Sequence, residues 1–228
     1  MRSALVTGGS SGIGLAIARI LREEGYALTL AARNVERLET AAHELEARTF
    51  GLDVRDEEQC RRLVAAHLET HSGLDVLVNS AGVGIAGRIG DTSTKHFDLQ
   101  QSVNLRGAFL VTREALPALR ESRGYVVNLA SIAGTIPTPG LATYGAAKAA
   151  LIALTRSLVR EERETGVRAT ALCPAFVDTP MTDFVKGQVS ADEMIRPQDI
   201  AAAVKLLLDV SPACVIPEII FQRPGEAL

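Results

Sequence analysis

The chain has 228 residues, of which 47% are hydrophobic and 22% charged, so it can bury a large core and is not intrinsically disordered. Its formal net charge of −3 provides no basic surface for nucleic acid or an anionic membrane. Three widely spaced cysteines predict neither a disulfide framework nor a zinc site, and neither a secretory leader nor a long apolar run is evident. These features predict a soluble protein of the cytoplasm.

Seven short apolar segments bounded by turn residues are typical of strands buried on both faces. In chain order they span residues 3–7, 27–31, 48–52, 76–79, 124–129, 168–173 and 218–221. Segments with helical spacing lie between them, at 13–24, 34–46, 56–71, 94–120, 143–165 and 197–208. This alternation predicts an α/β fold: a Rossmann-type doubly wound parallel sheet of about seven strands with helices on both faces.

Residues 1–228 contain no linker, repeat or low-complexity segment, and we expect one domain. The least regular stretch, 174–196, is too long for a tight connection and carries apolar side chains such as Met181. Long loops inside compact domains are usually functional. We therefore expect 174–196 to form a lid over a substrate.

A glycine-rich loop, Thr7-Gly8-Gly9-Ser10-Ser11-Gly12-Ile13-Gly14, follows the first strand and opens the first helix. In this context Gly8 permits the tight turn, Gly12 lets the backbone approach a pyrophosphate, and Gly14 allows the helix to pack closely. The helix N-terminus adds unpaired N–H donors and a partial positive charge. The loop predicts a dinucleotide site contacted by Ser10, Ser11 and Ile13 as well as the glycines.

The second strand ends in Ala31-Ala32-Arg33-Asn34, where the adenosine ribose of a dinucleotide is expected. A carboxylate here would hold the 2′-hydroxyl of NAD, whereas a guanidinium can pair with the 2′-phosphate of NADP. Arg33 therefore predicts a preference for NADP(H). NAD(H) remains the alternative if Arg33 is a solvated loop charge.

Tyr144 and Lys148 are four residues apart near the start of a predicted helix, so their side chains share one face. A lysine cation and a nicotinamide cation would both lower the pKa of the phenol from about 10, which would make it a usable acid or base. Ser131 ends the strand that precedes this helix, at the sheet edge where α/β folds place ligands, and can bind a substrate oxygen.

Motifs along nearly the whole chain occur in an order found together in one enzyme family. They are residues 7–14, Asp53-Val54, Asn79-Ser80-Ala81-Gly82, Asn104, Ser131, Tyr144 with Lys148, and Pro174-Ala175-Phe176-Val177-Asp178-Thr179. With these motifs the chain resembles the short-chain dehydrogenase/reductase family of the Tyr-x-x-x-Lys type. The resemblance implies an oxidoreductase that acts on CH–OH groups with NAD(P).

The resemblance also implies roles for individual residues. Tyr144 would protonate the carbonyl oxygen, Ser131 would orient that oxygen, Lys148 would hold the nicotinamide ribose, and Asn104 would position a proton-relay water. Asp53 and Val54 would line the adenine pocket, and the remaining cofactor contacts would be Asn79, Ala81, Gly82, Pro174, Val177 and Thr179.

Two departures from the family pattern concern the motif after the fourth strand and the C-terminus. Ser80 replaces the second asparagine of many members, which keeps a small polar side chain. Residues 215–220 lack the Asp-Gly-Gly ending of many tetrameric members. We expect a homodimer or homotetramer, for which helices 94–120 and 143–165 could supply an interface.

The sequence thus predicts hydride transfer between NADP(H) and a small-molecule carbonyl or alcohol. Alternatives are an NAD-linked alcohol dehydrogenase, a dinucleotide sensor without catalysis, and a nucleotide-sugar epimerase or dehydratase, which normally needs a larger substrate lobe. The candidate substrate walls are apolar and favour a hydrophobic carbonyl compound; they are Ile85, Ile136, Leu141, Phe176, Met181, Phe184 and Val185. His67 and His71 are four residues apart, but the zinc-hydrolase motif also needs a Glu directly after the first His, and here that residue is Leu68. We expect both histidines to be solvated residues near a helix end.

Overall fold

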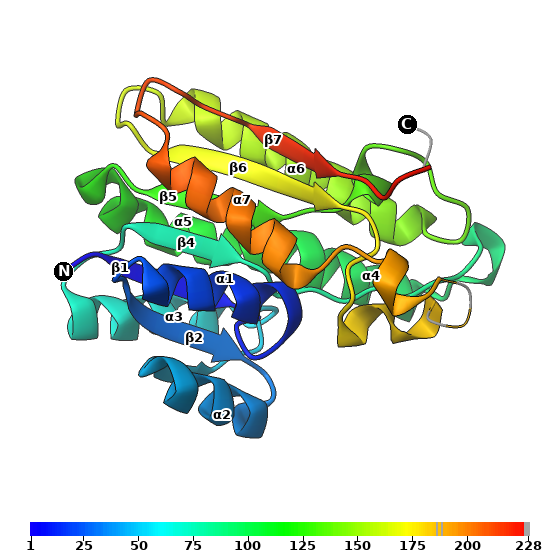
Figure 1. Ribbon diagram of the computed structural model, residues 1–228, viewed down its shortest axis with the longest axis horizontal. Helices are drawn as coiled ribbons and strands as arrows, with labels where there is room; N and C mark the ends of the chain where they lie inside the picture. The colour runs from blue at the N-terminus through cyan, green and yellow to red at the C-terminus, as the bar shows by residue number, and fades with distance from the viewer. Residues whose placement is uncertain (186, 188, 226–228) are drawn as a thin grey trace.

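Short aliphatic runs form the strands of one parallel sheet (Figure 1). The computed structural model describes residues 1–185, 187 and 189–225, with the backbone alone at 184 and 185. Within that part the strands are β1 (Ser3–Thr7), β2 (Ala27–Ala32), β3 (Arg48–Gly51), β4 (Val76–Asn79), β5 (Tyr125–Leu129), β6 (Arg168–Pro174) and β7 (Glu218–Phe221). Their order is β3-β2-β1-β4-β5-β6-β7, and every pair is parallel. The predicted doubly wound sheet is confirmed.

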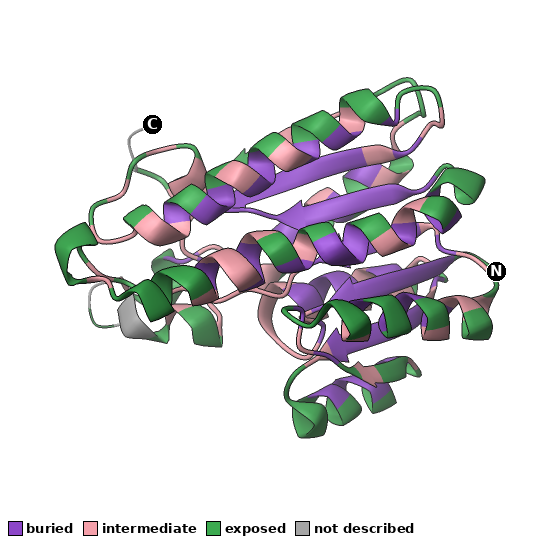
Figure 2. Ribbon diagram, turned by 180° about the vertical axis from the view of Figure 1, so that it is seen from behind, coloured by how far each residue is buried: buried purple, intermediate pink, exposed green. Residues whose placement is uncertain are grey.

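Helices cover both faces of the sheet (Figures 1 and 2). They are α1 (Gly12–Glu23), α2 (Val35–Leu45), α3 (Glu57–His71), α4 (Thr94–Gln101), α5 (Gly107–Ser122), α6 (Ala142–Glu161) and α7 (Pro197–Asp209). Side chains of α1, α2 and α7 share a core with Ala4 and Val6 of β1, whereas side chains of α3, α5 and α6 share another with Leu5. This alternation follows from the two-residue period of a strand.

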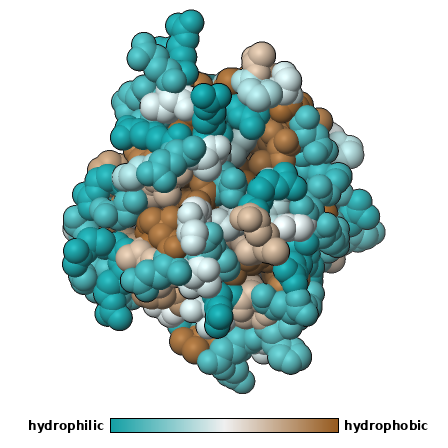
Figure 3. All heavy atoms as spheres, turned by 90° about the vertical axis from the view of Figure 1, so that its left-hand side faces the viewer, coloured by the Kyte–Doolittle hydropathy of each residue, from teal (hydrophilic) through white to brown (hydrophobic). Residues whose placement is uncertain are grey.

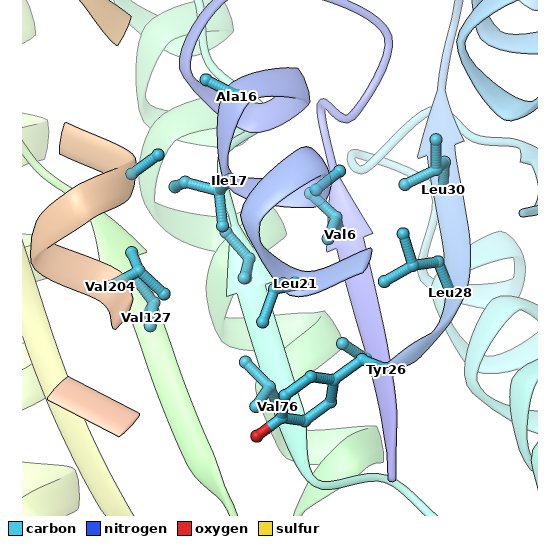
Figure 4. Packing of buried hydrophobic residues seen from close by; sticks show 14 of the residues in the cluster. Val6, Ala16, Ile17, Leu21, Tyr26, Leu28, Leu30, Val76, Val127 and Val204 are labelled. Carbon is cyan, nitrogen blue, oxygen red and sulfur yellow. The ribbon is translucent and has the colours of Figure 1, made fainter. Parts of the chain in front are cut away.

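The larger core lies between the sheet and α1 (Figure 4). Ile17 and Leu21 of α1 gather with Val204 of α7 and with Val76 and Val127 of the sheet, and all five side chains are buried. Burying a side chain of this size contributes about 1.5–3 kcal/mol, so the packing fixes α1 firmly on the sheet. The glycine loop that opens α1 is held in place by the same packing.

The predicted helix 94–120 is not one regular α-helix. It divides into α4, a π-helical turn at Ser102–Arg106, and α5. Directly after the turn, a Cβ on Gly107 would lie 2.8 Å from Cβ of Val54, so α5 approaches the loop after β3 closely. The Arg106 guanidinium also donates to the carbonyl of Arg55 at 2.7 Å. The prediction of a single continuous helix was wrong at this turn, because apolar spacing does not reveal one inserted residue.

His67 is buried, which corrects the expectation of a solvated side chain. Its Nδ1 lies 2.9 Å from Oγ1 of Thr29, and its Nε2 lies 3.2 Å from Oγ of Ser3 and 3.1 Å from the carbonyl oxygen of Gly73. Burial lowers the pKa of His67 to about 4, so the ring is neutral at pH 7. The side chain therefore joins α3 to β1 and β2 as a polar group of the core.

The 174–196 segment leaves the carboxyl end of β6 and returns to α7. Val177 forms a parallel bridge with Ile195, the amide of Ile195 donates to the carbonyl of Phe176 at 3.0 Å, and the amide of Asp178 donates to the carbonyl of Ile195 at 2.9 Å. Two short 3-10 turns, Pro180–Val185 and Ala191–Glu193, lie between these anchors. The base of the segment is thus fastened by backbone hydrogen bonds.

On the side at which the strands begin, the surface is mainly hydrophilic with apolar patches between the polar side chains (Figure 3). Among the helices in the described part of the chain, none is both long and apolar enough to cross a membrane.

The strand order reverses between β1 and β4, and open α/β sheets bind ligands in the crevice beyond the carboxyl ends of the strands at such a point.

Candidate active site

The glycine loop has the close contacts that its spacing predicts. Gly8 and Gly12 have φ values of +69° and +55°, a region that residues with a Cβ rarely occupy. A Cβ on Gly14 would lie 2.3 Å from the carbonyl oxygen of Gly8, so α1 packs directly against the turn. Within the described residues, the N-cap Ser11 makes no side-chain bond to the first turn of α1. The N–H groups of that turn are therefore available to an anion.

A cavity of about 590 Å³ opens beside this loop, within the usual size range of ligand sites. Thirteen of the predicted site residues line it: Gly8, Ser10, Ser11, Gly12, Ile13, Arg33, Asp53, Val54, Ala81, Gly82, Tyr144, Lys148 and Thr179. Met181, a candidate substrate-wall residue, lines it as well. The sequence did not predict a site role for the other lining residues, which are Ala31, Ala32, Asn34, Leu52, Ser80, Val103, Leu129, Ala130 and Pro180. Most of them lie at the last residues of a strand or just after it, and position at a strand end was the available signal.

One end of this cavity contains both signs of charge. The Asp53 carboxylate accepts from Nε and Nη2 of Arg55, at 2.9 Å and 2.6 Å, and from the Arg55 amide at 3.0 Å. The hydrogen bonds from Arg55 lower the pKa of Asp53, and the nearby Arg33 charge lowers it further. Among the described residues that line this cavity, Arg33 is the only arginine, so its guanidinium is the group that can bind an anion there.

Three other predicted residues, Gly14, Asn79 and Asn104, do not line either described cavity. Gly14 packs against Gly8, as its position in the loop predicts. The Asn79 amide is buried and donates to Oγ1 of Thr112 at 2.9 Å and to Oδ1 of Asn128 at 2.8 Å. It therefore joins the end of β4 to α5 and β5.

Asn104 lies in the π-helical turn and binds the loop that follows β4. Its Oδ1 accepts from the Val83 amide at 2.9 Å, and its Nδ2 donates to the Val83 carbonyl at 2.8 Å. A Cβ on Gly82 would lie 3.1 Å from Oδ1 of Asn104 and 3.8 Å from Nζ of Lys148. Asn104 and Lys148 are thus both close to Gly82, at the rim of the larger cavity.

A second cavity, of about 180 Å³, adjoins the first and shares Ile13, Tyr144, Thr179 and Met181 with it. Ser131, Pro174 and Val177 line it together with three of the candidate substrate-wall residues, Leu141, Phe176 and Met181. Ile85 and Ile136 are not among its lining residues, which corrects that expectation; the Ile85 amide is bonded to Gln100 instead. The side chains of Phe184 and Val185 lie outside the described part of the structure.

Tyr144 and Lys148 lie in the first turns of α6, beside the end of β5. Nζ of Lys148 donates to the Leu129 carbonyl at 2.6 Å and lies 5.6 Å from the centre of the Tyr144 ring. Burial lowers the pKa of Lys148 to about 8. Burial also raises the pKa of Tyr144 to about 12, against the lowering effect of its hydrogen bond with Ser131. The pKa of the phenol is therefore raised, whereas the sequence predicted that Lys148 would lower it.

The chain belongs to the short chain dehydrogenase family, whose sequence profile matches residues 2–189. It is an oxidoreductase of that family, as the motifs predicted. An uncharacterized oxidoreductase of Staphylococcus epidermidis is 38% identical over 204 residues, which are 88% of each chain. An uncharacterized oxidoreductase of Staphylococcus aureus is 38% identical over 205 residues, again 88% of each chain.

Two solved structures are similar over almost the entire chain. One is an alcohol dehydrogenase from the archaeon Thermococcus sibiricus in complex with 5-hydroxy-NADP, with a TM-score of 0.90 and 33% identity, covering 99% of this chain and 100% of that one. The other is a variant of the actinorhodin polyketide ketoreductase with NADPH, with a TM-score of 0.90 and 33% identity, covering 96% and 95%.

Proposed function

We propose that this protein transfers hydride between NADP(H) and a small hydrophobic carbonyl or alcohol compound, with Tyr144 as general acid and base. The observation that carries the proposal is the position of Tyr144, which lines both the larger cavity beside the glycine loop and the smaller, mainly apolar cavity. A proton donor at this junction can reach a substrate oxygen while the cofactor lies on the other side. Both structural relatives hold an NADP-type dinucleotide, which supports the cofactor assignment.

The residues of the larger cavity fit a dinucleotide phosphate. Gly8 and Gly12 place no side chain at the turns of the loop, and the first turn of α1 offers N–H donors to a pyrophosphate. Arg33 lines the cavity beyond β2, where it would pair with a 2′-phosphate. Asp53 and Val54 would line the adenine pocket, and Val177 and Thr179 would contact the carboxamide of the nicotinamide. Bound NADPH would supply the hydride for the carbonyl carbon.

The protein would supply the proton and the orientation. Ser131, which is hydrogen-bonded to Tyr144, would donate to the carbonyl oxygen while the Tyr144 hydroxyl gives its proton to that oxygen. The product is then an alcohol, and the phenolate formed is stabilised by the nearby Lys148 ammonium. Asn104 and Lys148 lie close together beside Gly82, which supports a water relay that returns a proton to Tyr144.

We also propose a lid over the substrate, a homo-oligomeric assembly and a cytoplasmic location for this protein. The 174–196 segment contributes Phe176, Thr179 and Met181 to the cavity walls, which supports its assignment as a lid over the substrate. We propose a homodimer or homotetramer, in which exposed apolar side chains of α4 and α5 are covered. The described cysteines are free thiols, which suits the reducing cytoplasm.

The test is NADPH consumption with a panel of aldehydes, ketones and β-ketoesters, run beside NADH and with Tyr144→Phe as the matched variant. We expect turnover with NADPH and a fall in kcat of about 10²–10⁴-fold in Tyr144→Phe, because the proton donor is removed. NADPH binding, followed by fluorescence, should change less than about twofold. Undiminished turnover in the variant would assign the proton to another group, and tight cofactor binding without any turnover would indicate a dinucleotide sensor.

A further inference from the structure

Gln100, near the end of α4, is a completely buried amide that joins two segments of the active site. Its Oε1 accepts from the Ile85 amide at 3.0 Å, and its Nε2 donates to Oγ1 of Thr143 at 2.7 Å. A buried amide that loses its partners is costly, so these two bonds hold the side chain in one orientation. One segment is the loop after β4, and the other is the first turn of α6.

On the loop side, hydrogen bonds from α4 and the π-helical turn hold the loop that packs against the Tyr144 ring. Gln100 and Asn104 are four residues apart and bind alternate loop residues, Ile85 and Val83 respectively. Gly84 lies between the two anchored residues and lines the smaller cavity. A Cβ on Gly84 would lie 3.9 Å from Cε2 of Tyr144, so the loop packs against the phenol ring.

On the helix side, hydrogen bonds from α4 hold Thr143, the residue directly before Tyr144 in the first turn of α6. Among the described residues, the N-cap Leu141 supplies no side-chain bond to the first turn of α6. That turn is instead held at Thr143, the residue before Tyr144, where Gln100 binds the hydroxyl and Nε2 of Gln101 donates to the carbonyl at 3.0 Å. Two successive glutamines thus tie the first turn of α6 to the end of α4, although neither accepts from the N–H groups that an N-cap would bind.

We propose that Gln100 is a positioning residue that fixes the Tyr144 phenol relative to the substrate cavity, through Ile85 on one side and Thr143 on the other. The proposal rests on the proposed function only in taking Tyr144 as the proton donor. Gln100 touches neither cavity, and the loop residue it anchors lies beyond Gly82, which lines the cofactor cavity. Loss of the bonds therefore lowers the rate of proton transfer and leaves cofactor binding intact.

The experiment compares Gln100→Leu, which removes both bonds at similar volume, with Thr143→Val, which removes the helix-side bond alone, and with the double variant. We expect kcat to fall about tenfold or more in each single variant, because small displacements of reacting groups are costly to rate. The double variant should be no slower than Gln100→Leu, since both changes break the same link. The NADPH dissociation constant should stay within about twofold of the unchanged protein.

A matched control is Ser122→Ala, which removes a hydrogen bond of 2.6 Å to the Leu74 carbonyl at the opposite end of α5. It should lower the free energy of unfolding by an amount similar to Thr143→Val, about 1 kcal/mol, with kcat unchanged. This comparison separates positioning from a general loss of stability. Hydrogen exchange at the Ile85 amide is expected to be faster in the two variants that carry Gln100→Leu and unchanged in Thr143→Val and Ser122→Ala, which confirms that the loop-side bond has been broken.

Two results would overturn the proposal. One is an unchanged kcat in Thr143→Val and Gln100→Leu despite faster exchange at Ile85. The other is an equal fall in kcat for Ser122→Ala. If the unchanged protein turns over no carbonyl compound, the proposed function fails by itself. The role of Gln100 is then tested by ultraviolet titration of the Tyr144 phenol, in which the titration curve of Tyr144→Phe is subtracted to remove the other tyrosines. If the pKa of Tyr144 is the same in Gln100→Leu as in the unchanged protein, the positioning role is refuted.

Discussion

At the scale of single residues, burial moves the pKa values of Tyr144 and Lys148 apart, upward for the phenol and downward for the lysine. The phenol, at about 12, remains protonated at neutral pH, and the lysine, at about 8, is still mainly a cation there. A neutral phenol beside a cation is ready to give a proton and to have the resulting phenolate stabilised. The arrangement before any ligand binds therefore suits reduction of a carbonyl, and alcohol oxidation needs a group that first removes the proton of Tyr144.

Arg33 gives the sharpest residue-scale prediction about the cofactor. We expect Arg33→Ala to weaken NADPH binding by about 1.5–3 kcal/mol, or roughly 10- to 150-fold, because a charge-assisted hydrogen bond to the 2′-phosphate is lost. NADH lacks that phosphate, and its affinity should change little. Both dissociation constants can be measured by fluorescence titration at one ionic strength.

The matched control for Arg33 is Arg37→Ala, which removes an exposed guanidinium of α2 that does not line the described cavities. It corrects for a general change of surface charge. Equal losses for NADPH and NADH in Arg33→Ala, or an equal loss of NADPH affinity in Arg37→Ala, would contradict a specific phosphate contact.

At the scale of elements, the turns that position the site depend on contacts from distant parts of the chain. The glycine loop could be predicted from the sequence because Gly8 and Gly14 satisfy local demands of the backbone. The partners of Asn104 could not be predicted, since they lie about twenty residues earlier and meet it only through the π-helical turn. Gln100 gave no sequence signal either, because a buried and a solvated glutamine on a helix look alike in the sequence.

His67 shows the same limit on α3, where helical spacing alone did not reveal that the ring is buried. Its hydrogen bonds reach Ser3 of β1 and Thr29 of β2, which lie 64 and 38 residues away in the chain. A polar residue is assigned to the surface by default, and only the folded contacts show that Ser3 and Thr29 satisfy the ring. Apart from the π-helical turn between α4 and α5, the strand and helix positions were predictable because each depends on periodicity within its own segment.

The buried His67 predicts an acid-sensitive fold. Its pKa falls from 6.5 to about 4 on folding, so between those values the unfolded chain binds a proton that the folded chain does not. Stability is therefore lost as the pH falls through this window, and His67 alone removes about 2 kcal/mol between pH 7 and pH 5. Urea unfolding at both pH values should show this loss.

The matched variant is His67→Gln, whose amide does not titrate. Carboxylates and the neighbouring His71 ring contribute a pH dependence to both proteins, so the difference between the two stability curves isolates His67. We expect the variant to be less stable at pH 7 and to lose about 2 kcal/mol less than the unchanged protein on moving to pH 5. Parallel curves would contradict a neutral, buried His67.

At the scale of the whole molecule, the strand order brings residues from the beginning, middle and end of the chain to one edge. The glycine loop, Arg33 and Asp53 follow strands on one side of the β1–β4 reversal, whereas Ser131, Tyr144 and the 174–196 segment follow strands on the other. The two cavities meet where these halves join. Cofactor and substrate residues are thus separated along the chain but adjacent in the fold.

The same architecture leaves apolar side chains exposed on α4 and α5. Phe97 on α4 and Phe109 on α5 are 43% and 42% exposed, and the Arg113 guanidinium lies 5.6 Å from the Phe109 ring centre. Aromatic rings and arginine are enriched at protein interfaces. Leu206 on α7 and Ile220 on the edge strand β7 are exposed on another part of the molecule. A dimer through α4 and α5 could form a tetramer through that second surface.

We therefore predict that Phe97→Glu with Phe109→Glu converts the assembly to monomers, because each introduced carboxylate would lose its water in the interface. Size-exclusion chromatography with light scattering measures this directly. Leu206→Glu with Ile220→Glu should leave the dimer intact and dissociate only a tetramer into dimers. A monomeric unchanged protein, or an assembly that persists in the Phe97 and Phe109 double variant, would contradict an interface on α4 and α5. Phe97 lies on the exposed face of α4, and Gln100 lies on its buried face. A comparison of kcat between the monomeric variant and the unchanged protein therefore also tests whether the assembly stabilises α4, the helix that we propose positions Tyr144.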